Sequence, residues 1–162
     1  MSSQSSPPKI AELKQRYLGK VIQDSRSPAG NFLALRLTEI ERGRVRFEMV
    51  VRAEMTNPFG GIHGGMMALA IDESIGWAVR SLESPRRYTS LNLNLDFLYA
   101  IGEGQILCLE AKILREGRRI LHAEAQAEDQ QGRLLATATS QLIVTNWEGL
   151  RRNPAVPGSS PP

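Results

Sequence analysis

The sequence has one cysteine, few aromatic residues and no long apolar segment, and these shortages exclude several classes of protein. Cys108 has no second cysteine with which to form an intrachain disulfide, so a disulfide-stapled secreted scaffold and a cysteine metal cluster are both excluded. The longest apolar runs, such as Met66 to Ile71, fall far short of the roughly 20 residues that cross a bilayer. The sequence therefore predicts a soluble protein of the reducing cytoplasm, with no membrane partner.

Long runs of one charge are also missing. The chain has 20 Lys and Arg against 17 Asp and Glu, a net charge of +3 at pH 7. Its basic residues cluster only as pairs, at Arg86-Arg87, Arg118-Arg119 and Arg151-Arg152. Because no basic stripe with interleaved aromatics occurs, a nucleic-acid partner is not expected. The modest positive charge instead suits an anionic ligand, including a phosphorylated cofactor.

Length and composition predict one globular domain. The 162 residues, 41% hydrophobic and 23% charged, are enough to bury one core. Residues 1–8 carry no basic segment followed by an apolar stretch, so we expect a disordered lead-in rather than a secretory signal. Residues 148–162 are rich in Pro, Gly and Ser, which is typical of a disordered tail. The folded domain is expected over residues 9–147.

The hydrophobic pattern predicts an α+β fold with one central helix. A short amphipathic helix is expected over 9–18, and residues 66–82 form a helix that is apolar on nearly every side of its first turns. The expected strands are residues 31–40, 44–52, 88–98, 105–115, 118–128 and 133–145. A six-stranded antiparallel sheet must wrap around the helix to cover it. Its open edges are expected to pair with a second copy.

Two adjacent acids, Asp72 and Glu73, interrupt the apolar helix. Burying an ionised carboxylate costs several kcal/mol unless it is hydrogen-bonded or paired. At least one of the two should therefore face a polar cleft or a partner subunit, although both could simply mark the exposed side of the helix. The two histidines, His63 and His122, have no metal-binding spacing with other ligands, so no metal site is predicted.

A glycine-rich turn precedes this helix. His63-Gly64-Gly65 could bring backbone N–H groups close to a ligand at a helix N-terminus, where they would polarise a carbonyl group. On its own, such a pair of glycines is more often only a turn. Asn57 lies six residues before His63 in an Asn-Pro pair, which is itself a turn signal.

Together these residues resemble a known family. The run from Asn57 through His63-Gly64-Gly65 and Asp72 to Gly76 is similar to the signature of the PaaI-like (phenylacetate-pathway) branch of hotdog acyl-CoA thioesterases. Supporting matches are Ser90-Leu-Asn-Leu-Asn94 and the turn at Gly117-Arg118. The resemblance covers about residues 45–144. It implies a hotdog fold, an acyl-CoA substrate, no cofactor beyond the coenzyme A of the substrate, and a homodimer that often pairs into a homotetramer.

The resemblance also implies roles for individual residues. The Gly64 amide, helped by Asn57, would hold the thioester carbonyl. Asp72 of the facing subunit would activate a water or attack the carbonyl directly. The supporting residues are His63, which would shape the loop, Ser90, which would place the water or the acyl group, and Gly65, which is a further amide donor. A thioester is already an activated acyl group, so these groups can suffice without a serine triad.

Substrate-binding residues are less closely defined. Glu73 offers a second acid, and a glutamate serves in related hotdog branches, but the resemblance favours Asp72, because its distance from His63 matches the PaaI-like pattern. Charge and loop position indicate Arg86, Arg87, Arg118 and Arg119 as candidates for the phosphates of coenzyme A. The acyl preference stays open, since the pocket walls could include Met66, Met67, Trp77 or Phe97.

Two other functions are compatible with the same residues. A hotdog hydratase or dehydratase would pair a histidine with an acid for proton transfer at carbon, although the Pro-Gly-rich loop expected after that histidine is missing. A non-catalytic protein could use the same cleft to bind acyl-CoA without turnover. Thioester hydrolysis is the leading hypothesis, because it uses the Asn57, His63-Gly64-Gly65 and Asp72 pattern as a whole.

Overall fold

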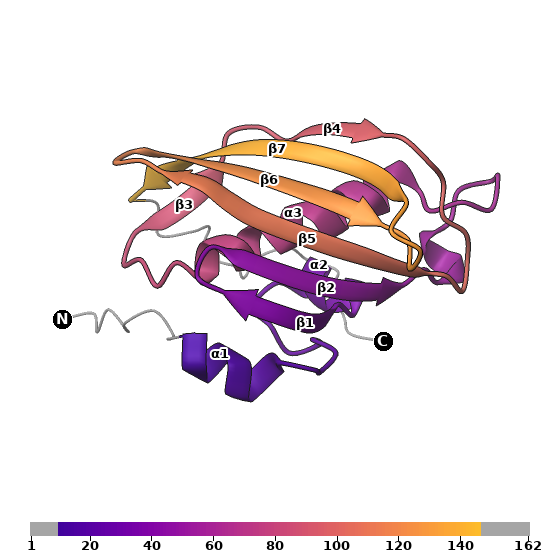
Figure 1. The fold of residues 1–162 in the computed structure, drawn as a ribbon, viewed down its shortest axis with the longest axis horizontal. Coiled ribbons are helices and arrows are strands. Elements are labelled where there is room, and N and C mark those ends of the chain that lie inside the picture. Colours follow the sequence, from indigo (N-terminus) through magenta and orange to yellow (C-terminus); the bar gives the residue numbers. More distant parts are fainter. Residues whose placement is uncertain (1–9, 147–162) are drawn as a thin grey trace, which may run out of the picture.

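The structure is a computed structural model that describes residues 10–146 (Figure 1). Its helices are α1 (Ile10–Tyr17), α2 (Pro28–Leu33), the 3₁₀ turn η1 (Ala53–Met55) and α3 (Gly64–Arg80), and its strands are β1 (Arg36–Glu41), β2 (Arg44–Val50), β3 (Arg87–Ser90), β4 (Asn94–Phe97), β5 (Ile106–Glu116), β6 (Ile120–Glu128) and β7 (Leu134–Thr145). The predicted disordered termini, residues 1–8 and 148–162, lie outside the described residues. No helix among the described residues is long and apolar enough to cross a membrane.

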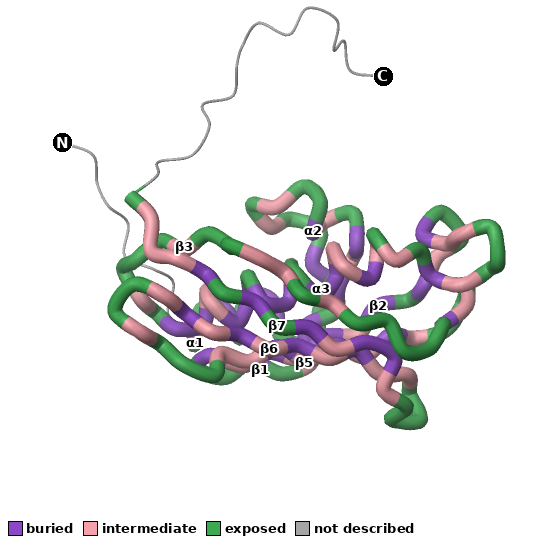
Figure 2. The backbone as a smooth tube through the Cα atoms, turned by 90° about the horizontal axis from the view of Figure 1, so that it is seen from above, coloured by how far each residue is buried: buried purple, intermediate pink, exposed green. Residues whose placement is uncertain are grey.

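All strands join one antiparallel sheet that curls around α3. The strand order is β1-β2-β5-β6-β7-β3, and β4 also pairs with β7. Side chains alternate along the strands, so Val45, Phe47 and Met49 of β2 are buried while their neighbours are not. Figure 2 shows α3 lying between the sheet and α2. The predicted α+β architecture, with a sheet wrapped around one central helix, is confirmed.

The core forms where the inner face of the sheet meets α3. Met67, Ile71 and Ile75 of α3 are at most 1% exposed. Trp77 packs edge-to-face against Tyr17 at 5.2 Å and against Phe47 at 5.8 Å between ring centroids. Met67 and Trp77 are therefore core residues, which removes both from the candidate pocket walls.

The first predicted strand, residues 31–40, is wrong in its first half. Residues 28–33 form α2 instead, and β1 starts only at Arg36. The helix is favoured because Ser27 caps it, with its Oγ accepting a hydrogen bond from the Gly30 N–H at 3.0 Å, and because a proline opens it. It ends at Ala34, whose φ of 55° is left-handed. These local signals outweigh the apolar run that follows.

The predicted strand over residues 88–98 is broken in the middle. Leu91 still pairs with Gln141, but Asn94 pairs with Thr139, so two residues oppose Ser140 and form a β-bulge. Asn92 holds the bulge: its Oδ1 accepts a hydrogen bond from the Gln141 N–H at 2.9 Å, and its carbonyl accepts one from Ser140 Oγ at 2.8 Å. Counting β3 and β4 as halves of one strand restores the six strands expected.

The two edges of the sheet differ. Along β1, residues 19–22 add a short extended segment, with Gly19 N–H donating to the Leu37 carbonyl and Ile22 N–H to the Leu35 carbonyl, each at 2.8 Å. The β3–β4 edge has no such cover among residues 10–146. Within the part of the chain that the structure describes, the outer edge of β4 is therefore available to pair with another chain.

Candidate functional site

Asp72 lies at a groove between α3 and β3. The groove has a volume of about 290 Å³. It is lined by Asp72, Glu73, Gly76 and Val79 of α3, by Tyr88, Thr89 and Ser90 of β3, and by Leu142 of β7. The structure thus brings the predicted residues Asp72, Glu73 and Ser90 together. Glycine at position 76 leaves space over the helix, since an added Cβ would meet nothing within 4 Å.

The Asp72 carboxyl is poised for proton transfer. It is accessible from the groove, but enough protein surrounds it that desolvation raises its pKa above the ordinary value of an aspartate. A hydrogen bond with Ser90 opposes part of that rise in pKa. A carboxylate with a raised pKa is a stronger base, so this environment suits proton abstraction from water.

The β-bulge is what points Ser90 at Asp72. Both Ser90 and Phe97 contact α3, at Asp72 and Gly64 respectively. They are seven residues apart, and an unbroken strand would send their side chains to opposite faces. The extra residue at Asn92 restores them to the same face. Asn92 therefore positions one side of the site without contacting Asp72.

The helix start presents one free amide. His63 is the N-cap of α3, and its Nδ1 accepts a hydrogen bond from the Gly65 N–H at 3.0 Å. No residue among 10–146 accepts one from the Gly64 N–H. His63 therefore occupies the Gly65 amide and leaves the Gly64 amide, at the positive end of the helix dipole, for a ligand. Of the two predicted amide donors, Gly64 is the better placed.

Asn57 shapes the loop before His63. Its Oδ1 accepts a hydrogen bond from the Phe59 N–H at 2.9 Å, and its Nδ2 donates to the Ile62 carbonyl at 3.4 Å. Its backbone N–H donates to the Gly61 carbonyl at 2.8 Å. In the single chain, these bonds make Asn57 a support for the loop that carries the Gly64 amide.

Phe97 lies directly against Gly64. A Cβ built on Gly64 would come within 3.2 Å of the Phe97 Cζ atom, which is closer than ordinary van der Waals contact. The Phe97 side chain is nevertheless 58% exposed. An aromatic ring thus stands beside the free amide, with most of its surface uncovered in the single chain.

Glu73 faces a different neighbour from Asp72. Its carboxylate accepts a hydrogen bond from the Ser27 hydroxyl, and a Cβ on Gly30 would lie 2.5 Å from Glu73 Oε2. Ser27 is also the cap of α2, so Glu73 holds the first turn of α2 against α3. This arrangement favours a structural role for Glu73 and leaves Asp72 as the acid beside Ser90.

The resemblance to acyl-CoA thioesterases predicts that Glu73→Gln keeps thioester hydrolysis within a few-fold of wild type. The side-chain carbonyl oxygen of the new glutamine can still accept a hydrogen bond from the Ser27 hydroxyl, so α2 stays in place, and Asp72 is untouched. Steady-state release of free thiol from an acyl-CoA measures the effect. A loss as large as that of an Asp72 variant would instead make Glu73 a catalytic acid.

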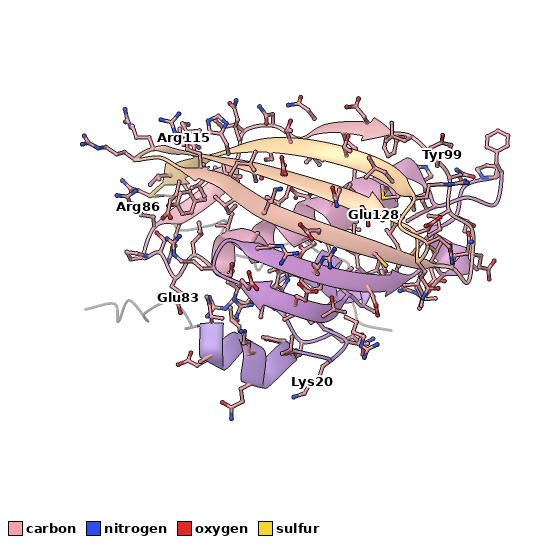
Figure 3. All side chains as sticks on the ribbon, viewed as in Figure 1. Lys20, Glu83, Arg86, Tyr99, Arg115 and Glu128 are labelled. Carbon is pink, nitrogen blue, oxygen red and sulfur yellow. The ribbon has the colours of Figure 1, made fainter. Side chains whose placement is uncertain are left out.

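The four arginines predicted for phosphate binding gather at one end of the molecule. Arg86 Nη1 donates to the Arg118 carbonyl at 3.2 Å, and the Arg119 carbonyl accepts from the Val144 N–H at 2.8 Å. Arg87 begins β3, next to Tyr88 at the end of the groove. Figure 3 shows Arg86 and Arg115 at this end, by the β5–β6 hairpin. A groove that starts at Asp72 therefore leads towards positive charge.

Two other hollows lie on the outer face of the sheet, away from α3. They are lined mainly by polar and charged residues, among them Glu39, Arg46, Glu110, Lys112 and Glu124. Ion pairs neutralise much of this face, with Arg46 at 2.6 Å and Arg44 at 2.8 Å from Glu110. Neither hollow contains a predicted site residue, so the groove at Asp72 is the candidate site.

Sequence reasoning missed the residues that support the site. The strand predicted from residue 31 leaves Ser27 and Gly30 without a role, although Ser-Pro is a recognisable helix start. The bulge at Asn92 had no clear signal, because Leu91, Leu93, Leu95 and Phe97 keep a regular alternation through it. Only the pairing partners on β7 reveal the extra residue.

Comparison with known proteins agrees with this geometry. Residues 59–136 match the family described as the thioesterase superfamily. A relative from Saccharolobus solfataricus named "Putative esterase" is 30% identical over 113 residues, which are 70% of this chain and 80% of the relative. Human acyl-coenzyme A thioesterase 13 is 25% identical over 123 residues, 75% of this chain and 78% of that protein.

A solved structure also shares the fold. The Escherichia coli PaaI protein from the phenylacetic acid degradation operon superposes with a TM-score of 0.67 and 20% identity, over 71% of this chain and 86% of that one. The fold, the esterase relatives and the family match together confirm the resemblance found in the sequence. The chain belongs to the thioesterase superfamily and is a thioester hydrolase of the hotdog fold.

Proposed function

We propose that the protein hydrolyses acyl-CoA thioesters in a site built by two copies of the chain, with Asp72 of one protomer and the Gly64 amide of the other acting on the same carbonyl. The observation that carries this proposal is the placement of both groups on α3. They are eight residues apart on one helix, which separates them by about 12 Å. A carbonyl within about 3 Å of the amide cannot also reach that carboxylate, so a second copy must supply one of them.

A two-fold pairing of α3 with its copy satisfies this requirement. If Gly64 meets Asp72 of the partner subunit, the two helices run antiparallel and cross near Ala68. Small residues on the groove side of α3, Gly65, Ala68 and Gly76, allow the close approach this needs. The outer edge of β4, which no other described strand pairs with, could pair with its copy to continue the sheet.

The reaction then needs only groups already described. The Gly64 N–H polarises the thioester carbonyl and stabilises the oxyanion. Asp72 takes a proton from a water held by Ser90, and the water oxygen attacks the carbonyl carbon. The carbon–sulfur bond breaks, and the coenzyme A thiolate leaves and takes up a proton. Direct attack by Asp72 would instead expel the coenzyme A thiolate and form a mixed anhydride. Hydrolysis of that anhydride at the Asp72 carboxyl carbon would place ¹⁸O from labelled water in the Asp72 side chain.

The positive charge at the arginine end of the groove favours coenzyme A, whose phosphates are anionic. Its pantetheine arm would run from Asp72 past Gly76 and Tyr88, and its phosphates would meet Arg86, Arg87, Arg118 and Arg119. The name of one relative, human acyl-coenzyme A thioesterase 13, supports acyl-CoA as the substrate class. The proposed chemistry uses no cofactor, and a lone cysteine suits a reducing cytoplasm. A pair of dimers, as the resemblance implies, would give a tetramer.

The direct test is release of free thiol from a panel of short, medium and aromatic acyl-CoAs. We expect turnover to fall as the pH drops through the raised pKa of Asp72, because only the ionised carboxylate can accept a proton. The fall should begin at a higher pH than for an ordinary aspartate. A kcat/KM profile against pH measures it.

Two outcomes would contradict the proposal. Hydration of an enoyl-CoA without thiol release would assign a hydratase. A monomeric mass by light scattering, together with full thioesterase activity, would exclude a site shared between protomers.

A further inference from the structure

We propose that Phe97 forms the wall against which the acyl group packs, and that it selects against acyl groups branched next to the thioester carbonyl. This inference rests on the proposed function, since it assumes that the Gly64 amide holds the carbonyl. The Phe97 ring is in contact with Gly64, the residue whose amide is free. Any acyl group bound through that amide must lie next to the ring.

Phe97 lies next to Gly64, so both residues would face the partner subunit at the dimer interface. Phe97 contacts Gly64 and Ser90 contacts Asp72 within one chain. When Gly64 approaches Asp72 of the partner subunit, Phe97 therefore approaches Ser90 of the partner subunit as well. The β-bulge is essential here, because without it Ser90 and Phe97 would point to opposite faces of the sheet. The ring thus faces the reacting carbon.

Phe97 is placed to contact the acyl portion of the substrate, because the thiol portion lies in the groove. The groove from Asp72 through Gly76 and Tyr88 leads towards the arginine end, which suits the phosphorylated thiol portion of the substrate. The acyl substituent projects from the other side of the carbonyl carbon. An exposed aromatic ring at that point offers an apolar surface and leaves little room for a branch.

The test compares Phe97→Ala with wild type on isomeric or closely matched thioesters. The pairs are butyryl-CoA with isobutyryl-CoA, and phenylacetyl-CoA with 2-phenylpropionyl-CoA. We expect wild type to prefer the unbranched member of each pair. In Phe97→Ala, the ratio of kcat/KM for the unbranched member to kcat/KM for the branched member should fall roughly tenfold, because one methyl group in an apolar pocket is worth about 10- to 200-fold. Phe97→Leu, a smaller truncation, should give an intermediate ratio and replaces Phe97→Ala if that variant is insoluble.

Tyr99→Ala is the matched control. Tyr99 is two residues away and 59% exposed, but its ring lies under Arg133 at 5.0 Å rather than against Gly64. Its removal should leave the ratio of branched to unbranched turnover within about twofold of wild type, since the ring does not line the acyl pocket. An equal shift in both variants would mean a general loosening and would overturn the assignment.

Two further results would overturn the role of Phe97. One is an active Phe97→Ala whose preference between isomers is unchanged. The other is a variant that changes only the preference between an acyl-CoA and the matching N-acetylcysteamine thioester. That result would place the ring beside the thiol portion of the substrate. Failure of the proposed function looks different, because wild type itself would then release no thiol from any member of the panel.

Discussion

Asp72→Asn should reduce kcat/KM for acyl-CoA hydrolysis by roughly 10²- to 10⁴-fold, the usual contribution of a positioned general base. Asparagine keeps the size and hydrogen-bonding capacity of the side chain beside Ser90 but cannot accept a proton from water. Thiol release under steady-state conditions measures the loss. Because the groove and the Gly64 amide are unchanged, substrate binding should survive, and calorimetry with a slowly hydrolysed acyl-CoA would detect it.

Glu73→Gln is the matched control for this variant. It neutralises the adjacent acid on the same helix, yet Glu73 bonds to Ser27 instead of Ser90. Activity should collapse in one variant and persist in the other. Near-normal turnover in Asp72→Asn would remove Asp72 from the reaction and with it the main link between the groove and thioester hydrolysis.

The same variant should be more stable at neutral pH. Burial raises the pKa of Asp72, so its ionised form is less favourable in the folded chain than in the unfolded chain, and ionisation lowers stability. Asparagine carries no charge and avoids that penalty. The difference in thermal midpoint between variant and wild type should shrink as the pH falls below the ordinary pKa of an aspartate, where Asp72 is protonated in both states. Protein concentration must be held fixed, because the proposed dimerisation would also shift the midpoint.

The fold was predictable because its pattern is regular. Hydrophobic periodicity indicates directly which residues are buried. It is strict in β2, where Val45, Phe47 and Met49 alternate with polar residues, and it is equally clear in the helix that is apolar on most sides. The sequence reading failed where a local bond outweighed the pattern. Ser27 turned an apolar run into α2, and Asn92 broke a strand whose alternation looked continuous. The cap of α2 is a local bond to the Gly30 N–H, whereas the bulge depends on Ser140 and Gln141, which are far away in the chain.

The site was predictable as a set of residues but not as an arrangement. The family resemblance singled out Asp72, and the structure adds that Ser90 is its partner, while Glu73 on the same helix bonds to Ser27 at the cap of α2. Spacing could not show that His63 occupies the Gly65 amide, nor that Phe97 lies on Gly64. The first contact depends on the turn geometry of the helix start, and the second depends on how β4 packs against α3. Together they decide which amide is free and what stands beside it.

Gly64→Pro should lower kcat by roughly 10²- to 10³-fold, the cost of deleting one oxyanion donor. Proline removes the N–H but is well tolerated at the first position of a helix. The preceding residue, His63, already has φ −65° and ψ 135°, a conformation that a following proline favours. Gly64→Ala is the control, because it adds the same Cβ beside Phe97 and keeps the N–H. Similar losses in both variants would point to crowding by Phe97 instead of a missing donor.

Mixing the two inactive variants would then test whether the site is shared. In a mixed dimer of Asp72→Asn and Gly64→Pro chains, one site carries both changes and the other carries neither. Random exchange of subunits makes half of the dimers mixed, so activity should recover to about a quarter of wild type. Sites contained within single chains would give no recovery. Because each parent is inactive by itself, the recovered turnover can come only from Asp72 of one protomer acting on a carbonyl held by Gly64 of the other.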